Sequence, residues 1–427
     1  MALIGRLIGK LLKRGSITIV YPDGKRATYG PGDGKTITLR ITDRKVLLEL
    51  VRNPRLALGE AYMDERLVIE DGTILDLFEL ITRSNRWEDG ARGRKLIGKS
   101  KLSKLAAVWR RNKPAKARRN VAHHYDLGNE LYEIFLDDDL QYSCGYFTDR
   151  ANSLEQAQAD KKAHIAAKLD LKPGQQVLDI GCGWGGMALY LHRIAKVDVL
   201  GITLSEAQLK VARQRAKDAG VDKHVRFELI DYRALDGAFD RIVSVGMFEH
   251  VGLAHYNEFF SKCRDLLKPD GVMLLHTIGR LGASSGAADP FTDKYIFPGY
   301  HLPSLAQATA ASAKARLIPA DIEILRLHYA YTLRQWLDRT IKARAKIEAM
   351  YDARFFRMWE SYLAGGIVMF ESGSGCNYQI QYVRDRNTLP ITRDYMAKAE
   401  NRYRQADAKE DPAVSRRVSG KSIELQD

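Results

Sequence analysis

The 427-residue sequence predicts an α/β protein, in which a mostly parallel sheet is covered by helices on both faces and a smaller α+β domain precedes it. Two patterns carry this prediction. From residue 161 onward, strand-like apolar runs alternate with helical stretches, an order that builds βαβ units. Before residue 120, the apolar runs are short and are broken by the turn sequences PDG and PGDG. A chain of this length can bury a core in each of two domains.

The first domain, predicted over residues 1–120, begins with a candidate amphipathic helix. Apolar residues recur at helical spacing in MALIGRLIGKLLKRG, and basic residues occupy the other side. This pattern is typical of a helix lying in a membrane interface, although a helix docked on its own domain would share it. The stretch is not a convincing signal peptide, because basic residues interrupt it and no small-residue cleavage site follows.

Short alternating or apolar runs follow and indicate a small β-rich or α+β unit. They lie at 16–30, 35–43 and 45–53, before a strand-like run at 66–72 and an amphipathic helix at 74–82.

The second domain, predicted over residues 121–400, contains the alternating elements. A buried strand runs into a glycine turn within 172–186. Further strands are expected at 197–205, 225–233, 239–251 and 272–279, and helices at 187–195, 206–220 and 256–271. Sheets of this kind bind ligands at the carboxyl ends of their strands. Residues 401–427 are polar and poor in aromatics, which predicts a flexible tail.

Positive charge is concentrated in the first domain. Residues 1–120 hold 27 Lys and Arg against 13 Asp and Glu, whereas the rest of the chain holds 40 of each. The stretch 91–119 carries twelve basic residues and no acid, which favours a polyanionic partner over a solvated charged linker. Because no aromatic-interleaved RNA-binding pattern accompanies it, an anionic membrane surface is favoured over nucleic acid.

The cysteines and the hydropathy pattern bear on the cellular compartment. Four well-separated cysteines form no CxxC pair, which suits a reducing compartment and argues against a disulfide framework or a structural zinc site. No run approaches the roughly 18–20 apolar residues that a membrane span requires. We therefore expect a cytoplasmic protein associated peripherally with the inner face of the membrane.

The sequence VLDIGCGWGG places Gly181, Gly183 and Gly186 in the spacing GxGxxG. Such glycines allow a sharp turn and close approach of the backbone to a ligand, as in dinucleotide-dependent dehydrogenases. Asp179 would repel a pyrophosphate but suits the positively charged amino-acid end of S-adenosylmethionine. The next strand also lacks the acidic residue that binds a ribose and reads GITLSEAQ instead. A methyl-donor site is thus favoured over a dehydrogenase or a purely structural turn.

At this point the chain resembles the cyclopropane-fatty-acyl-phospholipid synthases and the related mycolic acid cyclopropane synthases. The motifs, in order, are HHYDLGNELYEIFLDDDLQYSCGYF, VLDIGCGWGG, GITLSEAQ, VSVGMFEHVG, LLHTIG and LHYAYTL. The resemblance covers about residues 121–395 and implies a Rossmann-like class I S-adenosylmethionine-dependent methyltransferase domain. The absence of a DPPY-like or NPPY-like segment argues against an amino-group methyltransferase of nucleic acid.

The chemistry of this family sets requirements on the site. Methyl transfer to an unactivated alkene produces a carbocation, and ring closure needs a base that removes a proton from the new methyl group. The pocket should exclude water, and aromatic faces can stabilise the cation. Candidate aromatic residues are Tyr142, Tyr146, Phe147 and Tyr329. In the family the base is thought to be bicarbonate.

The resemblance implies a bicarbonate site formed by Cys144, Glu249, His276, Ile278 and Tyr329. Backbone N–H groups of Cys144 and Ile278 would donate to the anion, as would the side chains of His276 and Tyr329. Glu249 would accept from its hydroxyl. Taken without the resemblance, Glu249 and His276 could instead be strand-end residues bonded to neighbouring loops, and Tyr329 a core or interface tyrosine.

The resemblance also implies methyl-donor contacts from several segments. They are Tyr142, Ser143, Gly181, Gly183, Thr203, Leu204 and Gln208, with Asp231 and Tyr232 near the adenine, and Asp179 as argued above. Tyr125 is expected either to close over the donor or to pack a helix.

The expected reaction converts the cis double bond of an unsaturated phospholipid acyl chain into a cyclopropane at an anionic membrane surface, and a homodimer is plausible for the family. One alternative is methyl transfer without ring closure, which would leave a methyl-branched or methylene chain. Another is a basic nucleic-acid-binding protein with a degenerate Rossmann-like domain, which would not explain Glu249, His276 and Tyr329.

Overall fold

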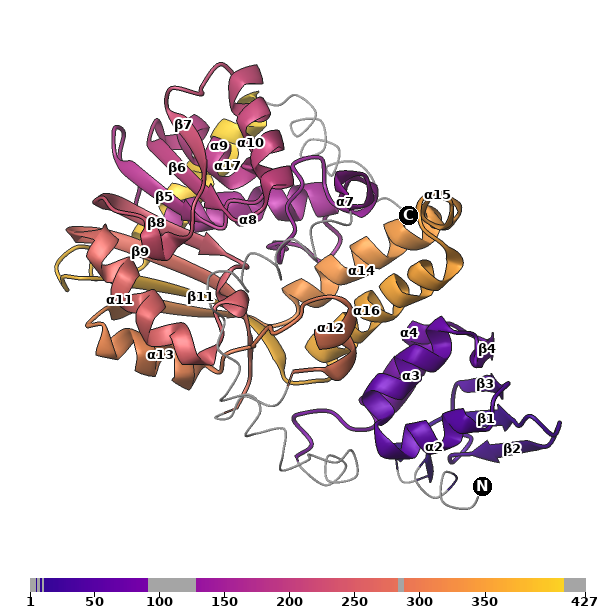
Figure 1. Ribbon diagram of the computed structural model, residues 1–427. Helices are drawn as coiled ribbons and strands as arrows, with labels where there is room; N and C mark the ends of the chain where they lie inside the picture. The colour runs from indigo at the N-terminus through magenta and orange to yellow at the C-terminus, as the bar shows by residue number, and fades with distance from the viewer. Residues whose placement is uncertain (1–4, 6–7, 10, 91–127, 283–287, 411–427) are drawn as a thin grey trace, which may run out of the picture. The chain divides into compact units, whose positions relative to one another are not determined.

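A computed structural model describes residues 5, 8–9, 11–90, 128–282 and 288–410 (Figure 1). The chain divides into two compact units. Unit 1 comprises residues 1–110, 280–302 and 329–376, and unit 2 comprises 111–279, 303–328 and 377–427. The amino-terminal region therefore shares a unit with two later segments. Both the domain boundary predicted near residue 120 and the basic stretch 91–119 lie outside the described residues.

Unit 1 contains a four-stranded sheet with the order β2-β1-β3-β4. β1 (Ser16–Val20) pairs antiparallel with β2 (Arg26–Tyr29) and parallel with β3 (Thr36–Ile41), which pairs antiparallel with β4 (Leu67–Asp71). The predicted PDG turn joins β1 to β2. Its glycine, Gly24, has a φ of 80°, a left-handed conformation that most side chains avoid.

Helices complete unit 1. They are α2 (Lys45–Arg52), α3 (Pro54–Met63), α4 (Ile74–Arg83), α12 (Pro290–Tyr295), α14 (His328–Lys342), α15 (Arg344–Met350) and α16 (Ala353–Glu371). The run 45–53 is thus helical, unlike the strand-like runs with which its sequence groups it. Val46, Leu47 and Leu50 are spaced to lie on one side of a helix, and Val46 is fully buried. α4 begins with a capping box formed by Thr73 and Asp76.

The described part of the amino-terminal helix packs on its own unit. Leu12 is buried in the same core cluster as Ile17 and Ile37, and Ile8 packs against that cluster. The Asn85 side chain donates to the Leu11 carbonyl at 2.7 Å. For Ile8 and Leu12, the structure therefore shows the docked alternative rather than apolar side chains left for a membrane.

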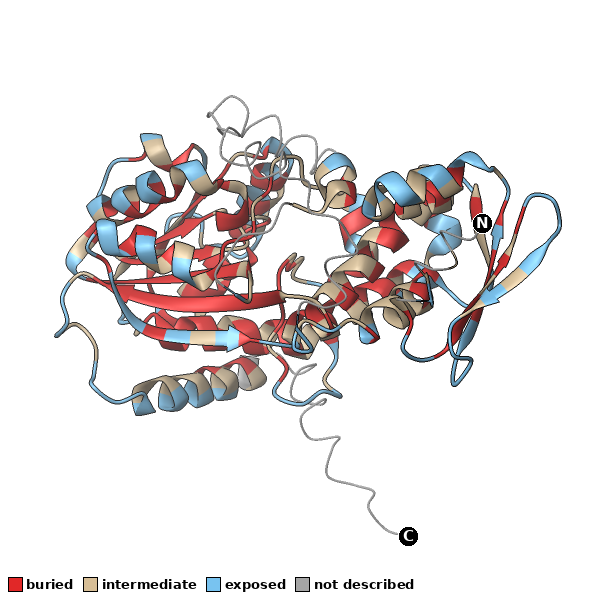
Figure 2. Ribbon diagram, turned by 90° about the horizontal axis from the view of Figure 1, so that it is seen from below, coloured by how far each residue is buried: buried red, intermediate tan, exposed pale blue. Residues whose placement is uncertain are grey.

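Unit 2 contains a seven-stranded sheet with the order β10-β11-β9-β8-β5-β6-β7 (Figure 1). Its strands are β5 (Gln176–Ile180), β6 (Asp198–Thr203), β7 (Val225–Leu229), β8 (Phe239–Val245), β9 (Leu267–Arg280), β10 (Ile318–Leu325) and β11 (Gly375–Val383). β5 pairs parallel with β6 and β8, β6 with β7, and β8 with β9, whereas β10 and β11 are antiparallel. Figure 2 shows how completely the central strands are buried.

Helices cover both faces of this sheet, as predicted. α8 (Leu154–Lys168), α9 (Gly186–Ala195), α10 (Glu206–Asp218) and α17 (Asp394–Glu410) lie on one side, and α11 (Tyr256–Leu266) and α13 (Leu305–Lys314) lie on the other (Figure 1). α7 (Asn129–Phe135) precedes them. β9 begins five residues before the predicted strand at 272, so the helix predicted to reach 271 ends at Leu266.

The predicted tail is wrong for residues 401–410, which belong to α17. Tyr403 is 4% exposed and joins the core cluster of Tyr190 and Leu191. The Arg404 Nε atom lies 3.1 Å from Asp160 Oδ1 of α8. The polar composition of these residues did not indicate a packed helix, because α17 is attached to α8 mainly by ion pairs and by one large aromatic residue.

Tyr403→Ala should destabilise unit 2, because it removes a buried aromatic side chain between helices. We expect the unfolding midpoint in calorimetry to fall by about 5–10 °C. The control is Gln405→Ala, which changes an exposed residue of the same helix. Equal midpoints for the two variants would contradict the packing role of α17.

Candidate active site

The glycine turn lies at the carboxyl end of β5. The backbone N–H groups of Gly181 and Cys182 both donate to the Ile202 carbonyl of β6, at 2.9 and 3.0 Å. Gly181 has a φ of 86°, and a Cβ there would lie 2.8 Å from the Met247 Cβ atom. Gly183 has a φ of 54° but no neighbour within 4 Å of a Cβ. The turn thus requires glycine at Gly181 for close packing and leaves space above Gly183.

Asp179, two residues before the turn, is buried and one of its carboxylate oxygens, Oδ2, has no hydrogen-bond partner among the described residues. Burial raises the pKa of Asp179 to about 7, although the Lys161 ammonium opposes the rise. A buried carboxylate oxygen without a partner is costly, and a cationic ligand group would satisfy it. This geometry fits the role predicted for Asp179 toward the amino-acid end of the methyl donor.

The loop containing Tyr142, Ser143 and Cys144 is held by the buried face of α8. Lys161 is fully buried and donates to Gln141 Oε1 at 2.6 Å and to Ser143 Oγ at 2.8 Å. Gln158 Nε2 donates to the carbonyls of Gln141 and Ser143, at 3.2 and 2.9 Å. The sequence does not single out either residue, because Lys and Gln side chains are usually exposed.

Three residues predicted to contact the methyl donor, Thr203, Leu204 and Gln208, lie between the end of β6 and the first turn of α10. Ser205 caps the helix by accepting from the Gln208 N–H at 3.3 Å, and Thr203 Oγ1 bonds Gln208 Oε1 at 3.3 Å. Thr203 and Gln208 are buried, while the neighbouring Leu204 is partly exposed. These contacts hold the side chains of Thr203 and Gln208 together at the end of β6, and Leu204 follows Thr203 in the chain.

Asp231 and Tyr232 follow β7 (Val225–Leu229), which ends four residues before the end of the strand predicted at 225–233. The Asp231 carboxylate accepts from the Arg233 Nε at 2.9 Å and from Nη2 at 2.7 Å, and it also caps the short helix η1 (Tyr232–Ala234). Tyr232 is buried against Phe259. The structure shows an Arg233 contact that the sequence did not predict, and the place of these residues near the adenine stays a prediction.

An aromatic cluster joins the loop to the glycine turn. Tyr132 of α7 lies edge-on to Tyr142, with ring centroids 5.2 Å apart, and 5.0 Å from Trp184. Phe135 contacts Tyr142 at 6.0 Å. The indole N–H of Trp184 donates to Asn129 Oδ1 at 2.9 Å. Tyr142 is thereby positioned from α7, while Tyr125 lies outside the described residues.

Two of the residues predicted to bind bicarbonate are in direct contact. Glu249, in the short helix η2 (Phe248–His250) after β8, accepts from the backbone N–H of Ile278 at 2.5 Å. Its second oxygen, Oε2, is buried without a partner among the described residues. Burial raises the pKa of Glu249 to about 7 even though the Ile278 hydrogen bond lowers it. A proton-bearing ligand beside Glu249 would supply the missing donor.

His276 of β9 is fully buried between two amides of β11. Its Nδ1 lies 3.1 Å from Gln379 Nε2, and its Nε2 lies 2.9 Å from the Asn377 amide. Gln379 Oε1 already accepts from Lys168 at 2.7 Å, so its NH2 group faces Nδ1. Neutral His276 then carries its proton on Nε2, and the Asn377 amide, whose nitrogen Nδ2 faces Nε2 at 2.9 Å, must be flipped for its oxygen to accept that proton.

This arrangement limits the role predicted for His276. Burial, together with the Lys161 and Lys168 ammonium groups, holds the pKa of His276 well below its ordinary value. The single N–H of the neutral ring is directed at Asn377. Donation from His276 to an anion therefore requires that contact to be exchanged.

A chain of polar contacts, buried at His276 and partly exposed farther on, extends from His276 to α17. Lys168 bonds both Gln379 and Glu323, and the Glu323 carboxylate accepts from His164 Nε2 at 2.7 Å. His164 Nδ1 lies 2.9 Å from Glu400 of α17. Lys168, Glu323 and Glu400 belong to three different elements, so this chain fixes His276 from well outside the site.

Tyr329 belongs to unit 1, whereas the other four residues predicted to bind bicarbonate belong to unit 2. It is 7% exposed and packs edge-on against Trp336, with Phe370 at 4.8 Å. The preceding residue, His328, accepts from the Phe147 N–H at 2.9 Å within unit 2. Whether Tyr329 reaches a bound anion stays a prediction.

Two aromatic candidates for stabilising the cation need comment. Tyr146 is stacked between His164, at 4.0 Å and 12°, and His328, at 4.9 Å and 8°. Both of its faces are therefore covered, which argues against contact with a substrate cation. Phe147 is buried and lies 6.4 Å from the His328 ring. The thiol of the buried Cys144 donates to the Gly145 carbonyl at 3.3 Å.

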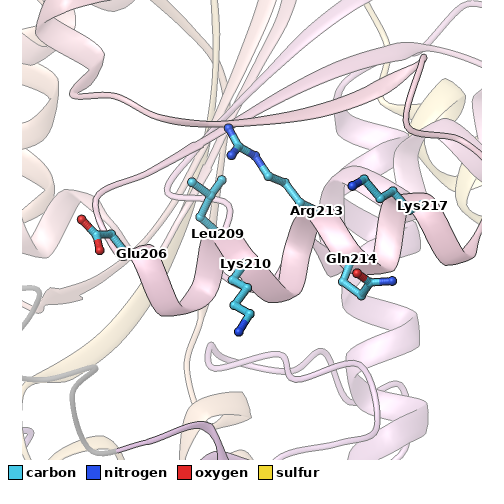
Figure 3. A pocket seen from close by; sticks show the side chains of 6 residues that line it. All are labelled: Glu206, Leu209, Lys210, Arg213, Gln214 and Lys217. Carbon is cyan, nitrogen blue, oxygen red and sulfur yellow. The ribbon is translucent and has the colours of Figure 1, made fainter.

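A separate hollow follows the surface of α10 (Figure 3). Its lining comes from this helix alone and consists of Glu206, Leu209, Lys210, Arg213, Gln214 and Lys217. Arg213 donates to the Phe227 carbonyl at 2.9 Å. None of the predicted site residues lines this hollow, so it is not part of the candidate active site.

The strand order, the glycine turn at the end of β5 and the polar groups beyond β6 and β7 define a Rossmann-like, class I S-adenosylmethionine-dependent methyltransferase. The chain belongs to the mycolic acid cyclopropane synthetase family, whose model matches residues 112–380. Residues 7–87 match a second model, which describes a domain of unknown function. Family membership confirms the resemblance inferred from the motifs and excludes a dehydrogenase.

Individual relatives agree with this assignment. The chain is 38% identical to the cyclopropane-fatty-acyl-phospholipid synthase of Escherichia coli strain K12, over 91% of this chain and 96% of that protein. It is 34% identical to a probable fatty acid methyltransferase of Pseudomonas putida, over 88% and 94% of the two chains. The structure of mycolic acid cyclopropane synthase CmaA1 with SAH and CTAB covers 62% of this chain and 97% of its own, with a TM-score of 0.59 and 32% identity.

Among the helices that the structure describes, none combines the length and apolar character needed to cross a bilayer.

Lys161→Met should weaken methyl-donor binding. The change keeps the approximate length of the side chain but leaves Gln141 Oε1 and Ser143 Oγ without their buried donor, so affinity for S-adenosylmethionine should fall about tenfold. Isothermal titration calorimetry measures this directly. Lys172→Met changes an exposed lysine in the loop after α8 and serves as the control. If both variants bound the donor like the wild type, Lys161 would have no part in holding the site.

Proposed function

We propose that this methyltransferase converts the cis double bond of an unsaturated phospholipid acyl chain into a cyclopropane, with bicarbonate as the base. The observation that carries the proposal is the buried Glu249 carboxylate, whose Oε1 contacts the Ile278 N–H and whose Oε2 has no partner within the described part of the chain. The names of the relatives from Escherichia coli and of the mycobacterial cyclopropane synthases support the reaction class.

The proposed reaction has two steps, methyl transfer and ring closure. The methyl carbon of S-adenosylmethionine bonds to one alkene carbon while its bond to sulfur breaks, which leaves S-adenosylhomocysteine and a carbocation. Loss of a proton from the new methyl group allows its electron pair to close the ring. Bicarbonate, when bound, would accept that proton. The site residues bind and orient the reactants and exclude water.

Glu249 and Ile278 fit an anion that carries its own proton. The Ile278 N–H would donate to an anion oxygen, and the Glu249 carboxylate would accept from the anion hydroxyl. The 2.5 Å contact between Glu249 and Ile278 would be exchanged for these two bonds. The Cys144 N–H and the Tyr329 hydroxyl are proposed as further hydrogen-bond donors to the anion. His276 and Asn377 would form the buried floor of the bicarbonate site.

Lipid analysis after expression in a host without such enzymes tests the reaction. A gain of one CH2 without a remaining double bond supports ring closure. A gain of one CH2 with a retained double bond, or a saturated methyl branch formed with a reductant, would support the alternative. The alternative remains relevant because the relative from Pseudomonas putida is named a probable fatty acid methyltransferase.

Glu249→Gln should retain donor binding and lower ring formation by about 10²–10⁴-fold, because an amide accepts more weakly and carries no charge.

In the wild type, the ionised fraction of Glu249 grows as the pH rises through its pKa of about 7. Turnover should therefore increase between about pH 6 and pH 8 at constant bicarbonate concentration.

Exposed Glu258→Gln is the matched control and should keep both turnover and its pH profile. Wild-type turnover in the Glu249 variant would remove this residue from the mechanism.

We further propose that the basic stretch 91–119 holds the enzyme at the cytoplasmic, anionic face of the membrane, where acyl chains are reached. Each basic residue near such a surface contributes about 1 kcal/mol at low salt. Reversing the charge of four lysines or arginines in 91–119 should therefore abolish co-sedimentation with anionic vesicles. Binding to neutral vesicles serves as the control. Unchanged binding, or a preference for duplex nucleic acid, would contradict the proposal.

A further inference from the structure

Two histidines and an aspartate converge at the amino ends of the strands in unit 2, opposite the edge that carries the glycine turn. His192 lies in the last turn of α9, Asp198 is the first residue of β6, and His224 immediately precedes β7. One ligand atom from each lies within 4.8 Å of the other two. The three residues are thus brought together from three elements of the fold.

The hydrogen bonds around these residues fix their ligand atoms. The His192 Nδ1 atom lies 2.7 Å from the Val197 carbonyl, which only accepts, so Nδ1 carries the proton and Nε2 presents its lone pair. Gln176 Nε2 donates to Asp198 Oδ2 at 2.9 Å. Carbonyl and amide partners of this kind orient the ligands in metal sites.

Asp198 and His224 are already joined by a hydrogen bond. His224 Nδ1 lies 2.8 Å from Asp198 Oδ1, and the His192 and His224 rings are stacked with centroids 5.1 Å apart. Asp198 accepts hydrogen bonds from both His224 and Gln176. The residues therefore offer two imidazoles and one anionic oxygen at a partly exposed position.

We propose that His192, Asp198 and His224 form a binding site for a divalent transition-metal ion of the zinc class. The ion takes the place of the proton between His224 Nδ1 and Asp198, that proton moves to His224 Nε2 so that the ligand stays a neutral imidazole, and the free nitrogen of His192 becomes the third ligand. Imidazole nitrogens with one carboxylate are a donor set suited to zinc and its neighbours rather than to calcium or magnesium.

The required adjustment is small. Tetrahedral coordination at about 2.0–2.1 Å places ligand atoms about 3.3 Å apart. A spacing within 4.8 Å therefore calls for side-chain movement of about 1–2 Å, which partly exposed imidazoles can supply. Water would complete the coordination shell. Bound metal would tie the end of α9 to the starts of β6 and β7, remote from the methyl-donor edge.

Calorimetric titration of the untagged, chelator-treated full chain with Zn²⁺ tests the site. We expect one ion per chain at micromolar or tighter affinity, and a loss of at least about tenfold in each of His192→Ala, His224→Ala and Asp198→Asn. The visible spectrum of bound Co²⁺ should change with the same variants. Thermal unfolding of the wild type, but not of the His224 variant, should shift upward in Zn²⁺.

His255→Ala is the matched control. His255 makes a comparable surface contact of 2.7 Å with Glu258, but no third ligand joins that pair among the described residues. Zinc affinity should be unchanged in this variant. Absence of saturable binding, or equal affinity in the wild type and the His192 and His224 variants, would show that the cluster is only an ion pair with a stacked ring. The test is independent of methyltransferase activity.

Discussion

The buried ammonium group of Lys161 supports the arrangement of the methyl-donor edge. It donates to Gln141 and Ser143, and its charge acts on Asp179 at the end of β5. A lysine that is fully buried must find acceptors, because an unpaired charge in the interior costs several kcal/mol. The loop before α8 supplies those acceptors. Its backbone conformation is in turn fixed by Gln158, so α8, the loop and the sheet edge depend on one another.

Two carboxylates at this edge, those of Asp179 and Glu249, have similar surroundings. Burial raises the pKa of both Asp179 and Glu249 to about 7, and each keeps one oxygen without a partner among the described residues. Such groups are unfavourable for stability alone but suit a site that binds cationic or proton-bearing ligands. The two differ in their partners, since Glu249 contacts a backbone N–H and Asp179 is opposed by Lys161. This difference matches the distinct ligands proposed for them.

His276 shows how a remote element contributes to the same region. Its ring is fixed by two amides of β11, and Lys168, Glu323 and His164 continue the contacts to α17. A polar helix near the end of the chain thereby influences a buried histidine. Polar networks of this kind specify one arrangement because each unsatisfied member would be costly.

The sequence by itself determined the α/β class, the glycine turn and the motif set that identifies the family, because these depend on local periodicity and fixed residue spacing. Glu249 and Ile278 were also predicted to share one ligand site, because the family resemblance assigns both to it. Only the tertiary structure decided that Lys161 is buried and that His276 faces Asn377 and Gln379. It also decided that α17 packs against α8. These outcomes depend on which side chains from distant segments meet, and a polar side chain reveals its burial only when its partners are present.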